Sequence, residues 1–476
     1  MTNNQPEEQY VIGMVGLGVM GRNLLLNMAD RGFRVAGYDK DSAKVEALSK
    51  ESQSEHVRGA TTVNEFITLL RKPRAVMMLV PAGAPVDSVI SDLMPYMQTS
   101  DLIIDAGNSY FKDTDLRTRR LSEKGIQFLG VGVSGGEEGA RRGPSIMPGG
   151  PKEAYESVRP IFEAVAAKVD GEPCVTYLGP GAAGHFVKMV HNGIEYGIMQ
   201  LIAETYDVMK RGVGLNDDEL HDVYESWNKR EPNCYLLEIT SHIFQKVDER
   251  TGKRLIDEIL DVAKQKGTGM WTSQSAMELS VPIPTIDTAV EMRNLSMLDK
   301  QRETAATFWP QPAVRFSGDR RSFLDQLCQG LYAAMIITYA QGFAVLAAAS
   351  DKYRYQYDLA AVASIWRGGC IIRASLLASI RKAYERQPGL SSLLLDGELA
   401  AEITSHEDAL RGAVVTMAQL GIPAAGFMSA LAYLDAFHSA WLPANLIQAQ
   451  RDYFGAHTYE RVDAQGTFHT DWERNS

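Results

Sequence analysis

Five polar side chains recur at helical spacing in one short stretch of the chain: Lys188, His191, Asn192, Glu195 and Tyr196. Steps of three and four residues place them on one stripe, roughly 140° wide at about 100° per residue. An amine, a carboxyl group and several hydrogen-bond donors are what a proton-transfer site needs. Because the other helix faces carry apolar residues, we expect the stripe to line a polar cavity inside the protein. A solvated surface stripe is the alternative.

A glycine-rich turn near the start of the chain predicts a dinucleotide site. An apolar run over 10–15 leads into Gly16-Leu17-Gly18-Val19-Met20-Gly21, and a helical pattern follows over 22–28. In this order of strand, G-x-G-x-x-G and helix, the backbone can approach a pyrophosphate at the helix N-terminus. A second strand over 33–38 ends at Asp39, where a carboxylate normally holds the ribose hydroxyls. A plain glycine turn in a βα unit is the alternative.

Composition and charge limit the class of protein. With 476 residues, 45% of them hydrophobic, the chain can bury a large core and should divide into two or three domains. The net charge of −11 makes nucleic acid and anionic membranes poor partners. The four cysteines are scattered, which favours a reducing cytoplasm over a disulfide framework or a zinc site. The polar first eight residues predict no signal peptide, and the apolar stretch 331–349 is interpreted as a buried helix.

Changes in hydrophobic period divide the chain. Up to about residue 180, β-rich runs at 75–80, 102–105, 126–129 and 175–178 alternate with helical stretches, which predicts βαβ units and a parallel sheet. After Gly179-Pro180-Gly181, helical patterns continue to about residue 440. The remaining tail is polar and has little core of its own, so we expect it to dock, for example on a second subunit. The predicted domains are 1–181, 182–440 and 441–476.

Two loops at the carboxyl edge of the predicted sheet carry further polar groups. Asn108 follows one strand, and Ser134, Gly135 and Gly136 follow another. Ligands of open α/β sheets bind at this edge. Asn108 is therefore a candidate to bridge cofactor and substrate, and residues 134–136 are candidates to offer backbone N–H groups to a carboxylate. Plain turns are the alternative for both.

Several longer runs resemble the 6-phosphogluconate dehydrogenase (decarboxylating) family. Besides the glycine motif they are residues 104–109, 132–143, 184–197, 265–269, 366–373 and 442–460, which span nearly the whole length. The resemblance implies an α/β Rossmann-like N-terminal domain, a large all-α domain and a C-terminal tail that threads into the partner of a homodimer. It also implies oxidative decarboxylation of 6-phosphogluconate to ribulose 5-phosphate and carbon dioxide in the oxidative pentose phosphate pathway.

The family's chemistry maps onto the polar stripe. Lys188 would be the base that removes the 3-hydroxyl proton, and Glu195 the acid that protonates the enediol at C1. Helix rise places them about 10 Å apart along the axis, so a six-carbon substrate can meet both. A lysine base needs a pKa of roughly 7–8 instead of about 10.4, and we expect burial beside Val187, Met189 and neighbouring cationic groups to lower it. No metal is expected, since Lys188 and Asn192 can stabilise the developing oxyanion.

The same resemblance implies the remaining site residues. Those for the substrate are Asn108, Ser134, Gly135, Gly136, His191, Asn192, Tyr196, Lys266, Thr268, Arg293 and, from the tail, Arg451 and His457, with the phosphate held by Tyr196, Lys266, Arg293, Arg451 and His457. Those for the cofactor are Gly16, Leu17, Gly18, Val19, Met20, Gly21, Asp39, Lys40, Asp41, Val80, Pro81, Ala82 and Asn108. If the tail crosses to the partner, each active site is shared and an isolated protomer is inactive.

The residues after the second strand depart from the family pattern. NADP-using members carry Asn-Arg-Thr or similar there, whereas this chain has Asp39-Lys40-Asp41. A carboxylate near a 2′-phosphate costs up to about 4 kcal/mol per charge pair at about 4 Å and an effective dielectric of about 20, and Lys40 offsets part of this. Pro81 also replaces a lysine often found after Val80. We therefore expect NAD to be accepted well, beside the family's usual NADP.

Two other functions stay open on the sequence. A β-hydroxyacid dehydrogenase for a non-phosphorylated acid shares the glycine motif, residues 134–136 and the Lys188/Asn192 pair, but it is shorter and lacks Arg451 and His457. The other alternative is a nicotinamide-binding protein without catalytic turnover. The presence of Lys188 and Glu195 argues against it, because such a protein requires neither a base nor an acid.

Overall fold

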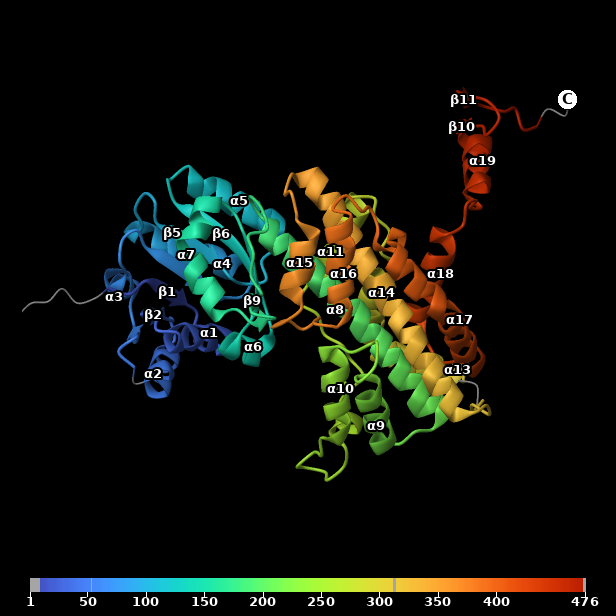
Figure 1. The fold of residues 1–476 in the computed structure, drawn as a ribbon, viewed down its shortest axis with the longest axis horizontal. Helices are drawn as coiled ribbons and strands as arrows, with labels where there is room; N and C mark the ends of the chain where they lie inside the picture. The colour runs from blue at the N-terminus through green and yellow to red at the C-terminus, as the bar shows by residue number, and fades with distance from the viewer. Residues whose placement is uncertain (1–8, 53, 311–313, 474–476) are drawn as a thin grey trace, which may run out of the picture.

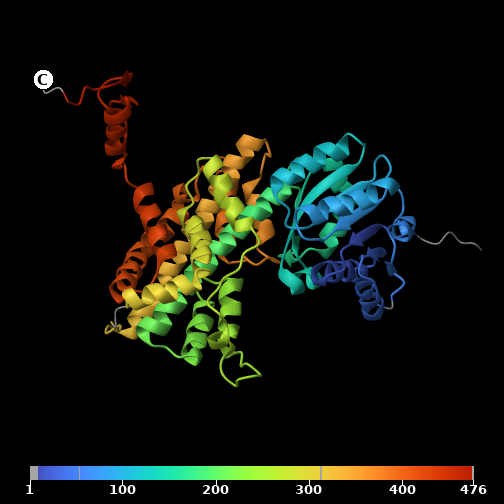
Figure 2. The same cartoon turned by 180° about the vertical axis from the view of Figure 1, so that it is seen from behind.

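The computed structural model describes residues 9–52, 54–310 and 314–473. It has an N-terminal α/β domain, a helical domain and a C-terminal tail that projects from the far end of the helical domain (Figures 1 and 2). The predicted fold class is confirmed. The first eight residues, on which the signal-peptide prediction rests, lie outside the described residues.

A seven-stranded sheet forms the centre of the N-terminal domain, with strand order β3-β2-β1-β4-β5-β6-β7. Neighbouring strands are parallel except for β6 and β7, which pair antiparallel. The order reverses between β1 and β4, and a ligand crevice is expected at this switch point. The strands are β1 (Ile12–Val15), β2 (Val35–Tyr38), β3 (Val57–Ala60), β4 (Ala75–Met78), β5 (Leu102–Asp105), β6 (Gln127–Ser134) and β7 (Ser145–Gly149).

Helices cover both faces of this sheet. The faces are buried because alternate strand residues, such as Met77 and Val76, enter two separate apolar clusters. One face packs mainly on α1, α6 and α7, and the other on α3, α4 and α5. The helices are α1 (Val19–Asp30), α2 (Ser42–Glu51), α3 (Val63–Leu69), α4 (Ala84–Leu93), α5 (Phe111–Ser122), α6 (Gly136–Arg142) and α7 (Lys152–Val165).

The predicted sheet differs from the observed one at three places. The strand predicted at 175–178 is wrong: only Val175 bridges to Ile146, before the chain bends toward the helical domain. The antiparallel strand β7 was not expected, and its direction follows from a connection too short for a parallel crossover. The edge strand β3 also escaped prediction, because its solvated edge position leaves only Ala60 buried.

Helices make up the second domain and pack around two long ones, α8 (Ala183–Asp207) and α14 (Arg320–Tyr353). The residues of α8 continue into the π-helical turn η2 (Val208–Val213). The other helices are α9 (Asp217–Trp227), α10 (Tyr235–Gln245), α11 (Thr268–Glu278), α12 (Pro284–Ser296), α13 (Asp299–Phe308), α15 (Leu359–Trp366), α16 (Leu376–Arg386), α17 (Gly397–Leu420) and α18 (Ala425–Phe437). The helical domain also contains the 3-10 turns η3 (Leu255–Glu258) and η4 (Leu393–Leu395). The short elements that precede α8 are the 3-10 turn η1 (Met94–Tyr96) and the hairpin of β8 (Lys168–Val169) and β9 (Glu172–Pro173).

The prediction of a buried helix at 331–349 is confirmed by α14. This helix is long and apolar enough to cross a membrane, but 83% of its most apolar window is buried inside the protein. Side chains of α8 and α14 share the largest apolar cluster. The apolar character of α14 is therefore explained by its place in the core.

The tail contains α19 (Ala444–Gly455) and a small hairpin of β10 (Tyr459–Glu460) and β11 (Thr467–Phe468). It lies at the end of the molecule remote from the sheet (Figure 1). The only buried residue of α19 is Asp452, which agrees with the expectation of little apolar core. The domain bounds 1–181, 182–440 and 441–476 stay a prediction.

A buried carboxyl group fastens α8 to α18. The two carboxyl oxygens of Glu204 accept hydrogen bonds from the backbone N–H groups of Gly426, at 2.7 Å, and Phe427, at 2.9 Å. Burial raises the pKa of Glu204 to about 7, although these bonds and one from Gln200 oppose the shift. The carboxyl group therefore titrates near neutral pH.

This raised pKa predicts a pH-dependent stability. The folded chain holds the Glu204 proton more tightly than the unfolded chain, so the contribution is complete below pH 4.5 and is lost as the pH rises through about 7. The full change is about 3 kcal/mol of unfolding free energy. We expect the urea midpoint of Glu204→Gln to fall less between pH 5 and pH 8 than that of the unaltered chain. If the urea midpoints of the unaltered chain and of Glu204→Gln fell equally between pH 5 and pH 8, the assignment of this pH dependence to Glu204 would be contradicted.

Candidate active site

The glycine turn between β1 and α1 forms a cradle for a pyrophosphate. Gly16 has φ +93°, and a Cβ on Gly21 would lie 1.9 Å from the Gly16 carbonyl oxygen, so both positions require glycine. Apart from Gly18 and the chain next to it, no atom of the described residues lies within 4 Å of the Cβ position of Gly18. Gly18 is also the N-cap of α1 and provides no side-chain cap. The open space and the exposed N–H groups of the first turn fit the anionic part of a dinucleotide.

A cavity of about 320 Å³ adjoins this cradle at the switch point between β1 and β4. Its lining includes Gly16, Gly18, Asp39, Lys40, Lys44, Val80, Pro81, Ser88 and Asp92. The Asp39 carboxylate accepts the backbone N–H of Leu17, at 2.8 Å, and that of Asp41, at 2.9 Å. This carboxylate therefore fixes the glycine turn against the end of β2 and lies where a ribose would bind.

Both lysines that line the cavity are paired with carboxylates. Lys40 Nζ lies 2.7 Å from Asp92 of α4, and Lys44 Nζ lies 3.4 Å from Asp39. The predicted partial compensation of Asp39 by Lys40 must be corrected, because Asp92 engages the Lys40 ammonium. Sequence reasoning missed Asp92, which is 52 residues from Lys40 and belongs to no motif.

Backbone contacts bring the polar stripe of α8 to the edge of the sheet. A Cβ on Gly132 of β6 would lie 2.4 Å from the Cβ of Lys188, and one on Gly184 would lie 2.2 Å from the Met147 carbonyl oxygen. These glycines let α8 lie directly on β6 and β7. The Lys188 end of the stripe therefore sits beside the Ser134 loop, as the prediction of one shared site requires.

The stripe is buried, so a solvated surface stripe is wrong. His191 is fully buried, while Lys188 and Asn192 are 6% and 9% exposed. The Glu195 side chain keeps 21% of its surface accessible. The terminal atoms of Lys188 and Glu195 converge on one imidazole nitrogen: Lys188 Nζ is 3.4 Å and Glu195 Oε2 is 3.8 Å from His191 Nδ1. The two groups thus lie closer than their helix positions imply.

A directional chain of hydrogen bonds sets the tautomer of His191. Asn192 Nδ2 donates to Thr268 Oγ1 at 3.0 Å, so the amide oxygen Oδ1 must face His191. This oxygen accepts a hydrogen bond from His191 Nδ1–H, also at 3.0 Å. On the other side, the Ile371 N–H donates to Ser134 Oγ at 3.4 Å, and the Ser134 hydroxyl donates to His191 Nε2 at 3.1 Å. His191 is therefore neutral. Burial holds its pKa well below the usual value, and any charge on Lys188 would lower it further.

This arrangement favours an uncharged Lys188. Because His191 Nδ1 carries a proton and donates it to Asn192 Oδ1, this nitrogen offers no lone pair to a charged Lys188 amine 3.4 Å away. Burial lowers the pKa of Lys188, while the Glu195 carboxylate and the Cys370 thiol oppose the shift. The expectation of neighbouring cationic groups is wrong, because burial is what lowers this pKa.

Glu195 shows the complementary shift. Although part of its side chain is open to solvent, the carboxyl group is otherwise enclosed, and burial raises its pKa against the opposing charges of Lys188 and Arg293. A base with a lowered pKa and an acid with a raised pKa thus share one stripe. This combination suits proton removal and return near neutral pH.

The candidate phosphate ligands of the helical domain lie at the far end of the stripe. The guanidinium of Arg293 stacks 3.6 Å from the centre of the Tyr196 ring and donates to the Lys264 carbonyl at 3.1 Å. Lys266 is exposed just before Thr268. An arginine fork and a lysine near one tyrosine suit phosphate oxygens.

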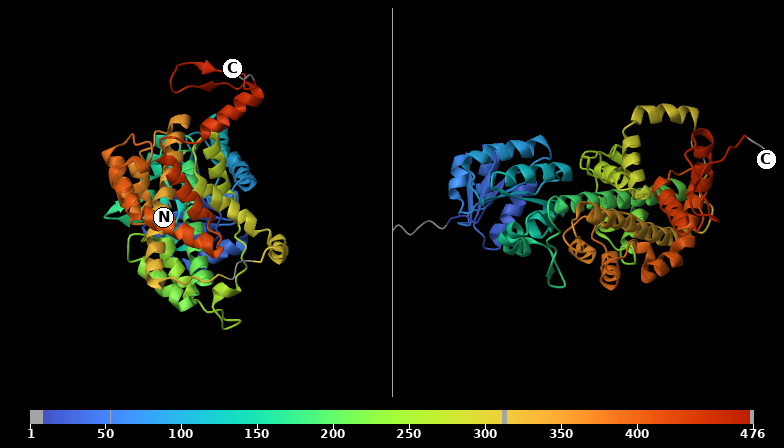
Figure 3. Two further views of the ribbon diagram at one scale, coloured as in Figure 1. Left: turned by 90° about the vertical axis from the view of Figure 1, so that its right-hand side faces the viewer. Right: turned by 90° about the horizontal axis from the view of Figure 1, so that it is seen from above.

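The remaining predicted residues fall into two groups. Asn108 and Gly136 are exposed at the carboxyl edge of the sheet, near the buried Ser134 and the partly buried Gly135. Arg451 and His457 are exposed on the tail, which Figure 3 shows standing off the helical domain. Within one chain, the structure does not bring these two residues to Lys188.

His185 is a connecting residue that the sequence reasoning missed. Its Nε2 donates to the Asp105 carbonyl at 3.1 Å, and its Nδ1 accepts from Thr114 Oγ1 at 2.7 Å. The Asp105 carboxylate in turn accepts from the N–H of Gly107, at 3.0 Å, and from Ser109 Oγ, at 2.6 Å. His185 therefore ties α8 to the Asn108 loop. Its position three residues before Lys188 was the signal that could have placed it on the same face.

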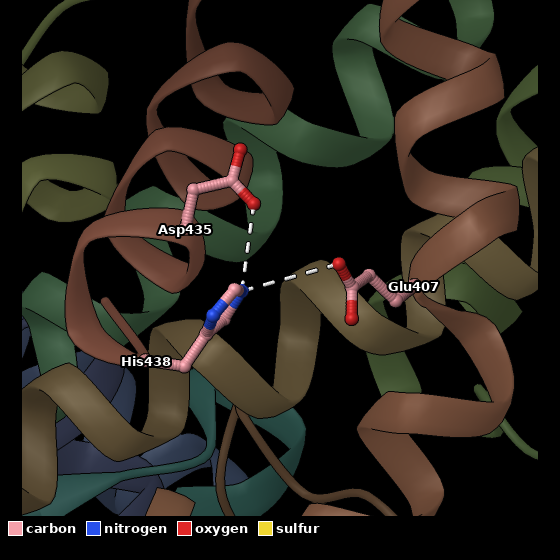
Figure 4. Close-up of side chains that lie close together, drawn as sticks. All are labelled: Glu407, Asp435 and His438. Atoms are coloured by element: carbon pink, nitrogen blue, oxygen red, sulfur yellow. Dashed lines mark ion pairs between the residues drawn. The ribbon is translucent and has the colours of Figure 1, made fainter. Parts of the chain in front are cut away.

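Away from the stripe, a cluster of side chains that could bind a metal ion lies between α17 and α18. Glu407, Asp435 and His438 place their ligand atoms within 4.8 Å of one another (Figure 4). However, Arg411 donates to Glu407 at 2.9 Å and to both oxygens of Asp435 at 2.6 and 3.0 Å. The guanidinium already binds both carboxylates, so the cluster is explained as an ion-pair network between two helices.

Comparisons with known proteins cover almost the whole chain. Residues 11–179 match the sequence family described as the NAD binding domain of 6-phosphogluconate dehydrogenase, and residues 184–472 match the family described as its C-terminal domain. The chain is 51% identical over 462 residues to the NADP(+)-dependent, decarboxylating 6-phosphogluconate dehydrogenase of Bacillus subtilis (strain 168), covering 97% of this chain and 98% of that protein. Identity to the decarboxylating enzyme of Escherichia coli (strain K12) is 48%, with the same coverage.

One solved structure has the same fold over its full length. The 6-phosphogluconate dehydrogenase of Plasmodium falciparum, described in its apo form and with NADP+ or 6-phosphogluconate, superposes with a TM-score of 0.93 at 42% identity. The alignment covers 97% of this chain and 100% of that one.

Proposed function

Since the chain belongs to the 6-phosphogluconate dehydrogenase family, we propose that it oxidises and decarboxylates 6-phosphogluconate to ribulose 5-phosphate and carbon dioxide. The observation that carries this proposal is the buried stripe of α8, where Lys188 and Glu195 converge on His191 with opposite pKa shifts. The reaction serves the oxidative pentose phosphate pathway in the cytoplasm, as expected for a chain with four unpaired, buried cysteines.

In the first step, Lys188 acts as general base on the 3-hydroxyl group. A nicotinamide dinucleotide, held by the glycine turn and Asp39, would supply the hydride acceptor for C3. The Lys188 amine takes the hydroxyl proton, and burial assists this step because it lowers the pKa of the amine. The charged amine and the Asn192 amide then stabilise the oxygen that develops negative charge on C3.

In the second step, the 3-keto acid loses carbon dioxide and leaves an enediol. The electron pair of the broken C1–C2 bond passes into the C3 carbonyl, whose oxygen takes a proton back from Lys188. Glu195 then protonates the carbon that carried the carboxylate, which becomes C1 of ribulose 5-phosphate. The hydroxyl on the former C3 gives its proton back to Lys188 and becomes the carbonyl at C2 of the product. The raised pKa of Glu195 keeps this proton available until the carbanion equivalent forms.

The phosphate site is completed by a second subunit. Tyr196, Lys266 and Arg293 supply one half of it, while Arg451 and His457 are on a tail remote from the stripe of their own chain. The tail exposes 61% of Leu446, 60% of Ile447 and 72% of Phe454, and an apolar surface of this kind favours a protein partner. The helix α13, which stands away from the body in Figure 3, has no buried residue. A homodimer with exchanged tails would cover both the apolar side chains of the tail and helix α13.

We expect the cofactor pocket to accept NAD well. The pocket has a carboxylate where a 2′-phosphate would lie, and both of its lysines are paired. We expect kcat/KM for NAD to equal or exceed that for NADP in steady-state kinetics at saturating 6-phosphogluconate. Replacing Asp39 by Asn should raise kcat/KM for NADP by about tenfold.

Asp41→Asn is the matched control for this prediction. The Asp41 side chain caps α2 by accepting the Ala43 N–H, and Asn preserves the cap. The control should therefore change the cofactor preference much less than Asp39→Asn. A large preference of the unaltered chain for NADP would contradict the prediction.

The two alternative functions are less well supported. A β-hydroxyacid dehydrogenase for a non-phosphorylated acid gives no role to Arg293, Lys266 or the tail. A protein without turnover gives no reason for the opposed pKa shifts of Lys188 and Glu195. Incubation with 6-phosphogluconate and either nicotinamide cofactor, with gluconate and 3-hydroxyisobutyrate as controls, separates the three. We expect equal amounts of reduced cofactor and carbon dioxide from 6-phosphogluconate. Reduction without carbon dioxide, or no reduction at all, would reject the proposal.

A further inference from the structure

The C-terminal tail is organised around one fully buried carboxylate, Asp452. Its Oδ1 accepts the Thr458 backbone N–H at 2.9 Å and the His469 Nδ1–H at 2.9 Å. Its Oδ2 accepts the Thr470 backbone N–H at 3.1 Å and the Trp472 Nε1–H at 2.9 Å. These donors precede β10 and follow β11, so one side chain fastens α19 to both ends of the hairpin.

The hydrogen bonds keep Asp452 charged. Burial by itself would raise the pKa of this carboxyl group, but the bonds from His469, Trp472 and the two backbone N–H groups outweigh it and hold the pKa at about 2. Four donors around one ionised carboxylate form a strong, geometrically defined centre. The tail has almost no apolar core, so these hydrogen bonds are what hold α19 and the hairpin together.

The two tail residues of the proposed phosphate site are adjacent to this centre. His457 lies between Ala456 and Thr458, whose φ angles of 47° and 63° are in the left-handed region. Non-glycine residues remain there only where neighbouring contacts hold them. Here the Ala456 N–H donates to the Asp452 carbonyl at 2.9 Å, and the Thr458 N–H donates to its carboxylate. The Asp452 backbone therefore holds the residue before His457, and the Asp452 carboxylate holds the residue after it.

A second link connects Arg451 to the same turn. Its guanidinium donates to Gln448 Oε1 at 3.0 Å, and Gln448 Nε2 donates to the Thr458 carbonyl at 2.6 Å. The N–H of Thr458 is the group that Asp452 accepts. Arg451 and His457 are thus held relative to each other through Thr458.

We propose that Asp452 is a positioning residue of the shared active site, which fixes Arg451 and His457 in the arrangement that receives the substrate phosphate of the partner subunit. This inference rests on the proposed function, in which the tail supplies those two ligands. Asp452 itself is enclosed within the tail and does not reach the substrate. Its contribution is to fix the ligands before the substrate binds, which removes an ordering cost from binding.

A graded series of variants tests the proposal. Asp452→Ala removes all four bonds. Asp452→Asn retains one carbonyl oxygen, which can keep the Thr458 and His469 bonds, and Trp472→Phe removes only one donor and serves as the matched control. We expect KM for 6-phosphogluconate to rise by about 10- to 100-fold in Asp452→Ala, less in Asp452→Asn and little in Trp472→Phe. The KM for the nicotinamide cofactor should not change, and kcat should fall much less than KM rises.

Hydrogen exchange gives a second measurement on the full-length protein. The amides of residues 456–460 should exchange faster in Asp452→Ala, while those of α8 remain as protected as in the unaltered chain. Sedimentation should show an unchanged oligomeric state. Parallel changes of kcat and both KM values, or loss of the oligomer in both Asp452 variants, would overturn the proposal in favour of a merely structural role.

The double variant Arg451→Ala/His457→Ala separates this inference from the proposed function. If the double variant leaves the substrate KM unchanged, the tail does not hold the phosphate, and that part of the proposed function fails together with this inference. If the double variant raises KM but Asp452→Ala does not, only the positioning role of Asp452 is overturned.

Discussion

Replacement of Lys188 by methionine is expected to lower kcat by about 10³-fold or more, because it removes the base from the hydroxyl oxidation. Methionine has similar length and flexibility, and it fits a position that is 6% exposed. Lys188→Arg should be equally inactive, since a guanidinium does not lose its proton at neutral pH. The measurement is the rate of cofactor reduction at saturating 6-phosphogluconate.

The stability of the same variants provides the control. Burial opposes the charged form of Lys188, so a neutral methionine should leave the thermal midpoint equal or higher. Binding of the nicotinamide cofactor, followed by fluorescence, should also be unaffected. A folded Lys188→Met protein with kcat within about tenfold of the unaltered enzyme would show that another group removes the proton.

Two variants, one without the base and one with weak substrate binding, are expected to restore activity at low substrate when they share a dimer. Arg451→Ala/His457→Ala should raise the substrate KM by at least about 10- to 100-fold, since each lost phosphate contact involves a charged group. A heterodimer of the Arg451→Ala/His457→Ala chain and the Lys188→Met chain contains one complete site. In that site, Lys188 of the first chain lies beside the unaltered tail of the second chain. In the purified heterodimer, one of the two sites is complete, so the activity at low substrate should return to about half of the unaltered value.

The experiment requires joint refolding or coexpression of two differently tagged chains, with purification through both tags. Each parent variant, treated in the same way, gives the background. If the tail folded back onto its own chain, the Lys188→Met chain would lack its base, the other chain would lack its phosphate ligands, and the heterodimer would remain inactive. That result would reject the shared site while leaving the acid and base assignments untouched.

The parts of the structure that were predictable depend on local periodicity. The glycine turn after β1 and the stripe from Lys188 to Tyr196 are encoded within short windows, so their elements and faces could be derived before any coordinates. The long apolar pattern of α14 likewise indicated a buried helix. The resemblance of long runs to one family then supplied the chemistry that periodicity alone left open.

The parts that escaped prediction are set by contacts between distant segments. Asp92 faces Lys40 only because α4 and the end of β2 border the same cavity. Asp452 becomes a buried centre only when Thr470 and Trp472 fold back onto α19. The edge strand β3 has too little burial to leave a pattern. Local sequence cannot encode such pairings, because each partner taken alone is an ordinary surface residue.

The most direct test of the acid and base assignment is a crystal structure of the dimer with 6-phosphogluconate bound. We expect the 3-hydroxyl oxygen within hydrogen-bond distance of Lys188 Nζ, the C1–C2 end facing Glu195, and the phosphate between Arg293 and the partner subunit's Arg451. A substrate whose 3-hydroxyl faces away from Lys188, or whose carboxylate end lies remote from Glu195, would contradict the account.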